Sequence, residues 1–257
     1  MLAGVPQGSI LGPLLYTLYT ADIPQTSSTL LSTFADDTAV LAIHPDPAIA
    51  SRNLQDHLSK IERWTKKWRL KINETKSAHI TFTLRKNTCP PVYINNSIIP
   101  RTETIKYLGL HFDKRLTWKE HVRKTRKHLD QRTRELYWLI DKRSPLSLSN
   151  KVLIYNMVLK PIWMYGLELW GCASASNTAI IQRYQAKILR IITNAPRFVT
   201  NLTLHSDLRI PQVRSVFQQR IETHRTALET HPNPLIEPIL AQHNRRLKRR
   251  WTFDELT

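Results

Sequence analysis

Two adjacent aspartates, Asp36 and Asp37, lie within the largely apolar stretch "STFADDTAVLA", residues 32–42. Neighbouring carboxylates repel each other, and burial makes it costlier to keep both ionised. A hard divalent cation such as Mg²⁺ would offset that cost, because it takes oxygen ligands and retains waters for phosphate substrates. A solvated hairpin turn is the alternative, since Asp is common in turns. The apolar residues on both sides predict a turn packed against a core, and they favour the cation site.

The elements around this pair can be predicted from local patterns. The β-branched and aromatic residues of 32–42 indicate a β-hairpin with a tight turn at the aspartates. Before it, the glycines of "MLAGVPQGSILGPLLY" predict a loop that leads into a helix from about Leu14. After it, apolar residues spaced by three and four from Leu54 to Trp68 predict an amphipathic helix, in which the two tryptophans, Trp64 and Trp68, belong to the core.

The rest of the chain changes from strands to helices. We expect strands at Ile72, Ile80 and Phe82 around a turn at residues 73–76, and a hairpin with Asn95 and Asn96 at its tip. Another strand pair is expected around Gly109. From Trp118 onward the pattern is helical, with helices near residues 118–140, 144–162 and 177–196. Two histidines of the first of these helices, His121 and His128, are interpreted as surface residues and not as metal ligands.

The charge distribution is uneven. The 257 residues include 38 Lys and Arg against 20 Asp and Glu, a formal net charge of +18. The first 51 residues contain four aspartates and no Lys or Arg. The basic excess that begins at Arg52 favours a polyanion such as nucleic acid as the partner, and a solvated basic surface is the alternative.

Cysteine content and hydropathy exclude several classes of protein. Two distant cysteines, Cys89 and Cys172, exclude a disulfide framework and a Cys-rich zinc module. A signal peptide is not expected, because the start of the chain has no basic segment. Apolar runs stay shorter than the ~20 residues that span a bilayer. An intracellular protein of the nucleus or cytoplasm, without a membrane partner, is therefore the expectation.

Four segments, in the same order, resemble a known family. The stretch "AGVPQGSILGPLL" followed by "FADD" is similar to the reverse transcriptase of non-LTR retrotransposons, most closely the jockey-like elements of arthropods. The later segments "WRLKINETKS", "IKYLGLHFD" and "LHSDLRIP" resemble that family as well, so the resemblance covers roughly residues 3–215. It implies an α+β fold, in which a partial polymerase palm of antiparallel β-hairpins packed with helices precedes an all-α thumb and a C-terminal extension. The implied domains are the palm (1–115), the thumb (116–145), the helical extension (146–230) and a basic tail (231–257).

The same resemblance implies the site. Asp36 and Asp37 would be catalytic and would hold Mg²⁺, and Lys76 would lie near the incoming triphosphate. Nucleotide and template contacts are implied for Pro6, Gln7 and Gly8, and a primer grip for Tyr107, Leu108 and Gly109. The implied partners are an RNA template, a DNA primer and deoxynucleoside triphosphates.

The resemblance also implies that the metal site is incomplete. Polymerases use two metal ions about 3.5–4 Å apart, and in this family a third aspartate precedes the Pro-Gln-Gly segment. No acidic residue precedes that segment here. The expectation is a truncated RNA-directed DNA polymerase that is inactive alone. The alternatives are a non-catalytic, basic nucleic-acid-binding relic of a mobile element, and a product that does not fold stably because half a palm sheet leaves an unpaired edge.

Overall fold

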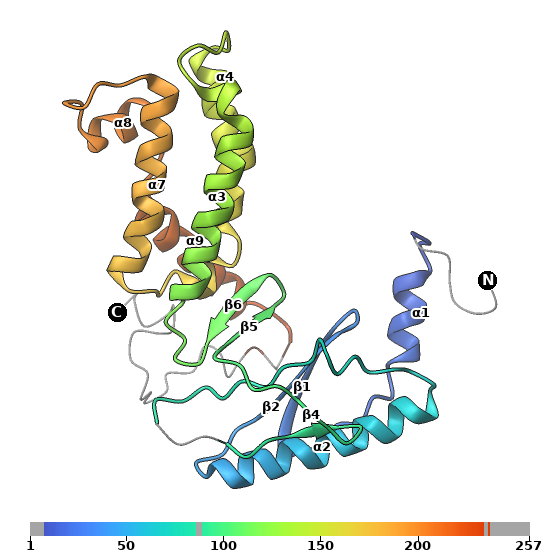
Figure 1. The fold of residues 1–257 in the computed structure, drawn as a ribbon. Helices are drawn as coiled ribbons and strands as arrows, with labels where there is room; N and C mark the ends of the chain where they lie inside the picture. The colour runs from blue at the N-terminus through green and yellow to red at the C-terminus, as the bar shows by residue number, and fades with distance from the viewer. Residues whose placement is uncertain (1–7, 86–88, 234–235, 237–257) are drawn as a thin grey trace. The chain divides into compact units, whose positions relative to one another are not determined.

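A computed structural model describes residues 8–85, 89–233 and 236 of the chain. The chain divides into two compact units, Met1–Gly109 and Leu110–Thr257, and each is described by itself. Helices and small antiparallel strand pairs make up the fold, which is compatible with the expected α+β class (Figure 1). Within the described residues, each sheet has two strands, in the pairs β1–β2, β3–β4 and β5–β6.

The first unit contains one long helix and several short elements. The long helix, α2, confirms the amphipathic pattern, and it begins where the Asp46 carboxylate accepts a hydrogen bond from the Ala48 N–H at 2.8 Å. The elements of this unit are α1 (Gly12–Tyr19), β1 (Thr29–Phe34), β2 (Asp37–Ala42), α2 (Pro47–Lys67), β3 (Tyr93–Ile94), β4 (Ser97–Ile98) and β5 (Thr104–Tyr107).

The β3–β4 hairpin supplies the small core of the first unit. Its turn residues Asn95 and Asn96 both have positive φ, 47° and 60°, as a type I′ turn requires, and Asn tolerates this backbone better than most residues. The predicted hairpin tip is thereby confirmed. Buried Val92, Ile94 and Ile99 pack with partly buried side chains that include Leu54 and Leu58 of α2. The hairpin therefore covers the part of the α2 apolar stripe formed by Leu54 and Leu58.

The prediction of strands at Ile72, Ile80 and Phe82 is wrong. The turn at 73–76 is present, with the Lys76 N–H donating to the Asn73 carbonyl at 3.3 Å, but the residues after it form only an isolated bridge between His79 and Arg101. The His79 N–H donates to the carbonyl of Pro100 at 2.9 Å. Because Pro100 has no N–H, it cannot donate to residue 77, and the ladder does not continue from this bridge toward the turn.

The second unit is helical after its first strand. The three helical stretches predicted after Trp118 are confirmed, and the middle one contains a π-helical turn, η1. Two of these helices begin at serine caps, where Ser147 and Ser174 accept hydrogen bonds from backbone N–H groups. The elements are β6 (Leu110–Asp113), α3 (Lys119–Ile140), α4 (Leu148–Ile154), η1 (Tyr155–Leu159), α5 (Lys160–Met164), α6 (Leu167–Trp170), α7 (Ala175–Thr193), α8 (Asn201–Asp207) and α9 (Val213–Glu229).

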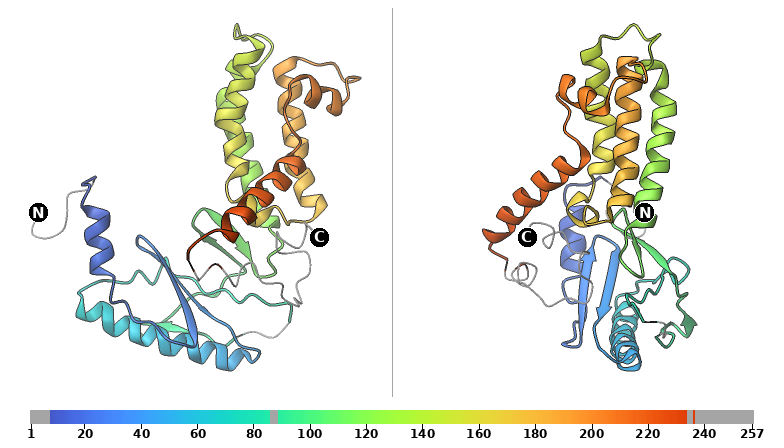
Figure 2. Two further views of the ribbon diagram at one scale, coloured as in Figure 1. Left: turned by 180° about the vertical axis from the view of Figure 1, so that it is seen from behind. Right: turned by 90° about the vertical axis from the view of Figure 1, so that its left-hand side faces the viewer.

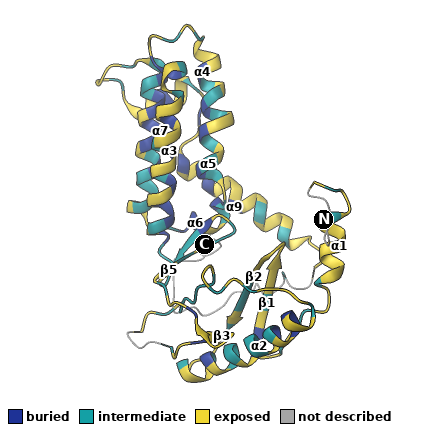
Figure 3. Ribbon diagram, turned by 45° about the vertical axis from the view of Figure 1, so that its right-hand side comes forward, coloured by how far each residue is buried: buried dark blue, intermediate teal, exposed yellow. Residues whose placement is uncertain are grey.

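Large aromatic and aliphatic side chains form the core of this unit. Trp163 and Trp170 are almost completely buried, together with Leu129 of α3 and Tyr184 of α7. The views of Figures 1 and 2 agree that α3 and α7 lie side by side, and Figure 3 shows buried residues along the helices. Burial of so much apolar surface is the main favourable term in the stability of this unit.

Residues of the segment "LHSDLRIP", residues 204–211, take part in a polar network inside the helical unit. His205 makes a 2.8 Å hydrogen bond from Nδ1 to the Ile210 carbonyl, and its Nε2 lies 3.1 Å from Gln182 Nε2. The Gln182 side chain accepts from the Val213 N–H, and buried Gln185 donates to the Tyr155 hydroxyl. Because each of these polar groups has a partner, the network joins α7, α8 and α9 without an unsatisfied group.

None of the helices in the described residues is both long enough and apolar enough to cross a membrane.

Gly171 lies against the Phe217 ring of α9. A Cβ added at this position would lie 1.8 Å from Cε2 of the Phe217 ring. We expect Gly171→Ala to destabilise the protein by about 1–3 kcal/mol, because the buried ring must move. Urea unfolding measures this change. Gly12→Ala is the control, since a Cβ there meets nothing within 4 Å, and an equal loss of stability in both variants would contradict the prediction.

Candidate active site

The two aspartates lie at the tip of the β1–β2 hairpin. The antiparallel register runs from Thr29 opposite Ala42 to Phe34 opposite Asp37, so that Ala35 and Asp36 form the turn. Ala35 has a φ of 49°, a left-handed conformation that is uncommon for a residue other than glycine. This register confirms the predicted hairpin, and it places one carboxylate in the turn and the other on the first residue of β2.

The tip of this hairpin is exposed, so the expectation of a turn packed against a core is wrong. Both aspartates are exposed, and the Phe34 side chain beside them is 63% exposed. The opposite end of the hairpin is the buried one, where Thr29 faces α2. A lone two-stranded sheet covers little apolar surface, and the solvent at its tip spares both carboxylates the cost of desolvation.

A buried histidine anchors the base of the hairpin. His57 of α2 has no exposed surface, and its Nε2 makes a 2.8 Å hydrogen bond with the Pro24 carbonyl. Since a carbonyl only accepts, Nε2 carries the proton, and Nδ1 contacts the Thr29 hydroxyl at 2.5 Å. The sequence analysis missed His57. Its position one residue before Leu58 of the apolar stripe was the available signal.

The short helix α1 lies near the aspartates. Burial raises the pKa of the Tyr16 phenol, and the negative charge of Asp36 raises that pKa further. The end of α1 is held by the Tyr19 hydroxyl, which donates to the Trp68 carbonyl at 2.5 Å, and Asp22 beyond the helix accepts from the indole N–H groups of Trp64 at 2.8 Å and Trp68 at 3.2 Å. Both α1 and β1 are thus positioned by contacts with α2.

The segment with the implied primer grip also reaches this hairpin. The Tyr107 hydroxyl, at the end of β5, lies 3.4 Å from the Ser32 hydroxyl of β1. Leu108 and Gly109 form the turn between β5 and β6, with φ of 45° and 79°. A turn with positive φ at both positions suits a two-residue hairpin and explains the glycine.

The structure describes only some of the residues that the resemblance implies in nucleotide and template contact. Pro6 and Gln7 lie outside the described residues. Gly8 has a φ of 80° and open space around it, so its conformation and not its packing requires glycine. Lys76 is exposed in the turn after α2, and within the described residues it makes no ion pair with either aspartate.

The donor set at the hairpin does not complete a two-metal site. In the part of the chain that the structure describes, no group of three or more His, Cys, Asp or Glu side chains could hold a metal ion. Asp36 and Asp37 are the two carboxylates at the tip. A two-metal centre needs further oxygen ligands to hold both ions. The hairpin alone does not fit the expected magnesium centre.

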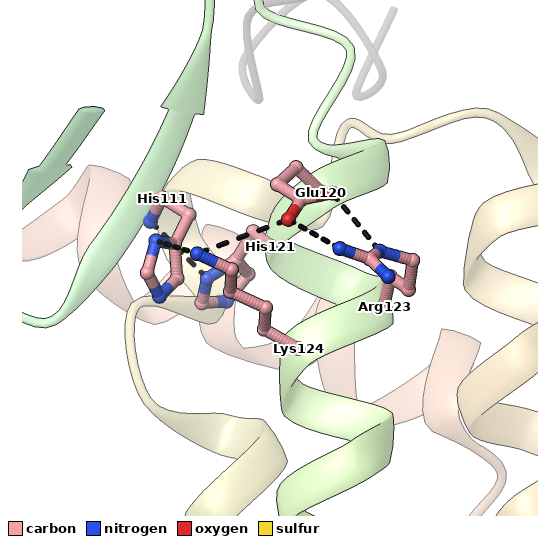
Figure 4. Close-up of polar contacts among 5 residues, drawn as sticks. All are labelled: His111, Glu120, His121, Arg123 and Lys124. Carbon is pink, nitrogen blue, oxygen red and sulfur yellow. Dashed lines mark hydrogen bonds and ion pairs between the residues drawn. The ribbon is translucent and has the colours of Figure 1, made fainter. Parts of the chain in front are cut away.

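A second polar cluster lies where α3 begins, and its residues are His111, Glu120, His121, Arg123 and Lys124 (Figure 4). Arg123 Nη2 is 2.7 Å from Glu120 Oε1, and Lys124 Nζ is 3.8 Å from the same oxygen. Lys124 Nζ also lies 3.4 Å from His111 Nδ1. One carboxylate, Glu120, pairs here with two cations, Arg123 and Lys124, and within the described residues the cluster is not a metal site.

The interpretation of His121 as a surface residue is wrong, although His128 is exposed as expected. His121 lies between the rings of Trp118 and Trp170, at centroid distances of 6.1 and 5.9 Å. Burial lowers its pKa to about 4, with a smaller contribution from His111. Its spacing from Trp118 and from Thr125, which is also buried, places His121 on the inner face of α3, a signal that was present in the sequence.

This buried histidine predicts how stability depends on pH. The unfolded chain binds a proton at His121 near pH 6.5, whereas the folded chain does so only near pH 4. Stability is therefore lost as the pH falls from 6.5 to 4, by about 3 kcal/mol for this group. Unfolding free energies measured across that range should fall less steeply in His121→Gln. The control His128→Gln should keep the wild-type slope, and a wild-type slope in His121→Gln as well would contradict the assignment.

Known proteins provide an independent comparison. Residues 2–112 match the family described as reverse transcriptase (RNA-dependent DNA polymerase). The chain is 41% identical, over 99% of its length, to a Drosophila melanogaster protein named "Probable RNA-directed DNA polymerase from transposon X-element". It is 35% identical, over 92% of its length, to the RNA-directed DNA polymerase from mobile element jockey of the same fly. No solved structure matches the chain.

These matches cover only part of the related proteins. The chain spans 29% of the X-element protein and 27% of the jockey protein. The expected resemblance to jockey-like elements is confirmed by these relatives.

Proposed function

We propose that the chain is part of an RNA-directed DNA polymerase of a jockey-like, non-LTR retrotransposon, because its residues 2–112 match the reverse transcriptase family. One observation carries the proposal. Within the segment that matches the family, two aspartates lie together at an exposed hairpin tip, with the hairpin base buried against α2. A tip of this kind can approach a nucleic acid while its backbone stays fixed.

The proposed roles follow the segments of the resemblance. Asp36 and Asp37 are the carboxylates that this chain contributes to the reaction centre, and Asp36 would be the direct ligand of a metal that other residues must also hold. Magnesium is the metal that this family generally uses. Residues 1–115 act as part of the palm, residues 116–145 as the thumb and residues 146–230 as a helical extension. An RNA template, a DNA primer and deoxynucleoside triphosphates are the proposed substrates.

The aromatic residues beside the tip have a proposed part in this arrangement. The Tyr107 hydroxyl contacts the hairpin at Ser32, and the negative charge of Asp36 raises the pKa of the Tyr16 phenol. Together they would limit the positions that the tip can take. Positioning matters because in-line attack on a phosphate requires the reacting groups to be aligned.

A domain replacement tests the polymerase role. The matching segment of the Drosophila jockey polymerase is replaced by residues 2–233 of this chain, and extension of a primer on an RNA template is measured. We expect the hybrid to extend the primer. Asp36→Asn or Asp37→Asn should lower its rate at least about a hundredfold, because the substitution removes a charged ligand at the point of reaction.

The control for this experiment lies on the same hairpin. Thr33 is exposed on β1 and pairs with Thr38, so Thr33→Val keeps the strand and leaves both carboxylates in place. Its hybrid should keep the activity of the unsubstituted hybrid. Full activity in the Asp36→Asn hybrid would contradict the catalytic assignment.

The isolated chain is expected to behave differently from the hybrid. Because the described residues do not complete a two-metal site, the 257-residue protein with Mg²⁺, template, primer and nucleotides should give no extension product. Processive synthesis that Asp36→Asn abolishes would show that this reasoning is wrong. Salt-dependent binding without extension, in the isolated chain and in an inactive hybrid alike, would instead favour a non-catalytic nucleic-acid-binding relic.

A further inference from the structure

One helix of the second unit is apolar on its outer side as well as on its inner side. The elements α4, η1 and α5 follow one another without a break, so residues 148–164 form one continuous helix. Every residue from Val152 to Met164 is apolar or aromatic except Asn156 and Lys160. A helix that is apolar all round is expected to be covered on all sides.

The inner side of this helix is already covered. The helix contacts α3 and α7, and its buried side chains recur every four residues, at Lys151, Tyr155, Leu159 and Trp163. Tyr155, Leu159 and Trp163 have no exposed surface. These residues belong to the core of the unit, so the inner side is not available to a partner.

The outer side is equally apolar but exposed. Its exposed side chains form a row that we call the outer stripe, which consists of Leu153, Met157, Val158, Pro161 and Tyr165. Met157 is 69% exposed, and Leu153 and Tyr165 are each 56% exposed. Scattered apolar residues are ordinary on a protein surface, whereas a contiguous row of them indicates an interaction surface.

The π-helical turn η1 widens this stripe. The Lys160 N–H donates to the Tyr155 carbonyl, which closes a turn that holds one residue more than an α-helical turn. Pro161 has no N–H and cannot make the α-helical hydrogen bond back to Met157. Because the turn has an extra residue, Met157 and Val158 both face outward.

The charges around the outer stripe favour a second copy of this chain as its partner. Among the described residues 144–169, the charged side chains are buried Lys151, half-buried Lys160 and Glu168, which pairs with Arg220 at 3.0 Å. Exposed Lys and Arg residues lie on α3, α7 and α9. Two copies of a chain with net charge +18 therefore repel least when their outer stripes face each other. An acidic partner would bind the basic faces instead.

The spacing of the stripe suits contact with an identical stripe. Leu153, Met157, Pro161 and Tyr165 are four residues apart, and such a row forms a ridge on a helix. Two ridges of this class interdigitate when the helices cross at about 50°. Proline is smaller than its neighbours Met157 and Tyr165, so the ridge has a low point that a large side chain of another copy can fill. A two-fold axis gives each copy the same contacts.

The size of the stripe predicts a reversible dimer. At these exposed fractions its side chains present roughly 500 Å² of apolar surface. Two stripes together would bury roughly 1,000 Å², which is at the lower end of the interfaces that hold proteins together. An association in the range of about 1–100 μM is therefore expected.

We propose that the outer stripe is the contact surface of a reversible homodimer, in which the helices of two copies cross on a two-fold axis near Met157 and Pro161. The proposal goes beyond the polymerase role and does not depend on it. Association is measured without nucleic acid, nucleotides or metal, so failure of the polymerase role would leave this result unaffected.

Analytical ultracentrifugation of the full chain tests the dimer. Between about 1 and 100 μM, the mass should rise from 30.0 kDa toward twice that value. The association should be at least as strong in 1 M salt, because an apolar contact is not screened. A chain that stays monomeric throughout would overturn the proposal, since another part of the polypeptide or another protein would then cover the stripe. So would a dimer that 1 M salt dissociates.

Paired substitutions locate the contact surface. Leu153→Glu with Met157→Glu should weaken association at least about tenfold, because the new carboxylates lose solvent in the contact and repel each other. The matched control is Phe198→Glu with Leu202→Glu, which adds the same two charges at side chains that are 85% and 69% exposed outside the stripe. It should associate like the wild type. Equal association in the two variants would contradict the stripe as the surface.

Cross-linking provides a second measurement that needs no charge in the stripe. In a Cys89→Ser background, where the remaining Cys172 is buried, Met157→Cys should give a covalent dimer with a short bismaleimide. Leu202→Cys should stay monomeric under the same conditions. Equal yields from the two cysteines would overturn the proposal. Thermal unfolding at the wild-type temperature confirms that each variant is folded.

Discussion

Two neighbouring carboxylates cannot both be buried and ionised without a cation, and the first unit is arranged around this constraint. The chain places Asp36 and Asp37 at the exposed tip of a hairpin and anchors the other end of that hairpin. His57 and Thr29 form the anchor within α2 and β1. The tip stays accessible, and its position is still set by buried hydrogen bonds.

In the second unit the core is apolar and many of the described cations lie on the surface. Its core is aromatic and aliphatic, with a satisfied polar network around Gln185 and His205. In the part of this unit that the structure describes, many cations lie on helix surfaces, and several that line the hollows along α3 and α7, among them Lys127 and Arg134, have no carboxylate partner. A stable core allows the surface to carry unbalanced positive charge, because repulsion between exposed cations is screened by solvent and salt.

Local chemistry explains which elements could be predicted. The Asn95–Asn96 turn, the serine caps of α4 and α7 and the apolar stripe of α2 each depend on residues close together in sequence. The failed predictions depend on distant partners. The strand expected at Ile80 is reduced to the single bridge between His79 and Arg101, and the ring of His121 is buried by Trp170 from another helix. Local spacing indicates that His121 lies on the inner face of α3, but it does not identify Trp170 or Arg101 as the partner.

The sequence by itself determined the resemblance to reverse transcriptases, the hairpin that carries the aspartates and the order of helices after Trp118, because motifs and helical or alternating periods are local properties. Only the tertiary structure decided that the hairpin tip is exposed, that His57 anchors its base and that basic residues of α3 and α7 line shared hollows. Burial and the pairing of charges depend on which residues meet across long stretches of chain. Such meetings are set by packing of the whole unit, and no single segment encodes them.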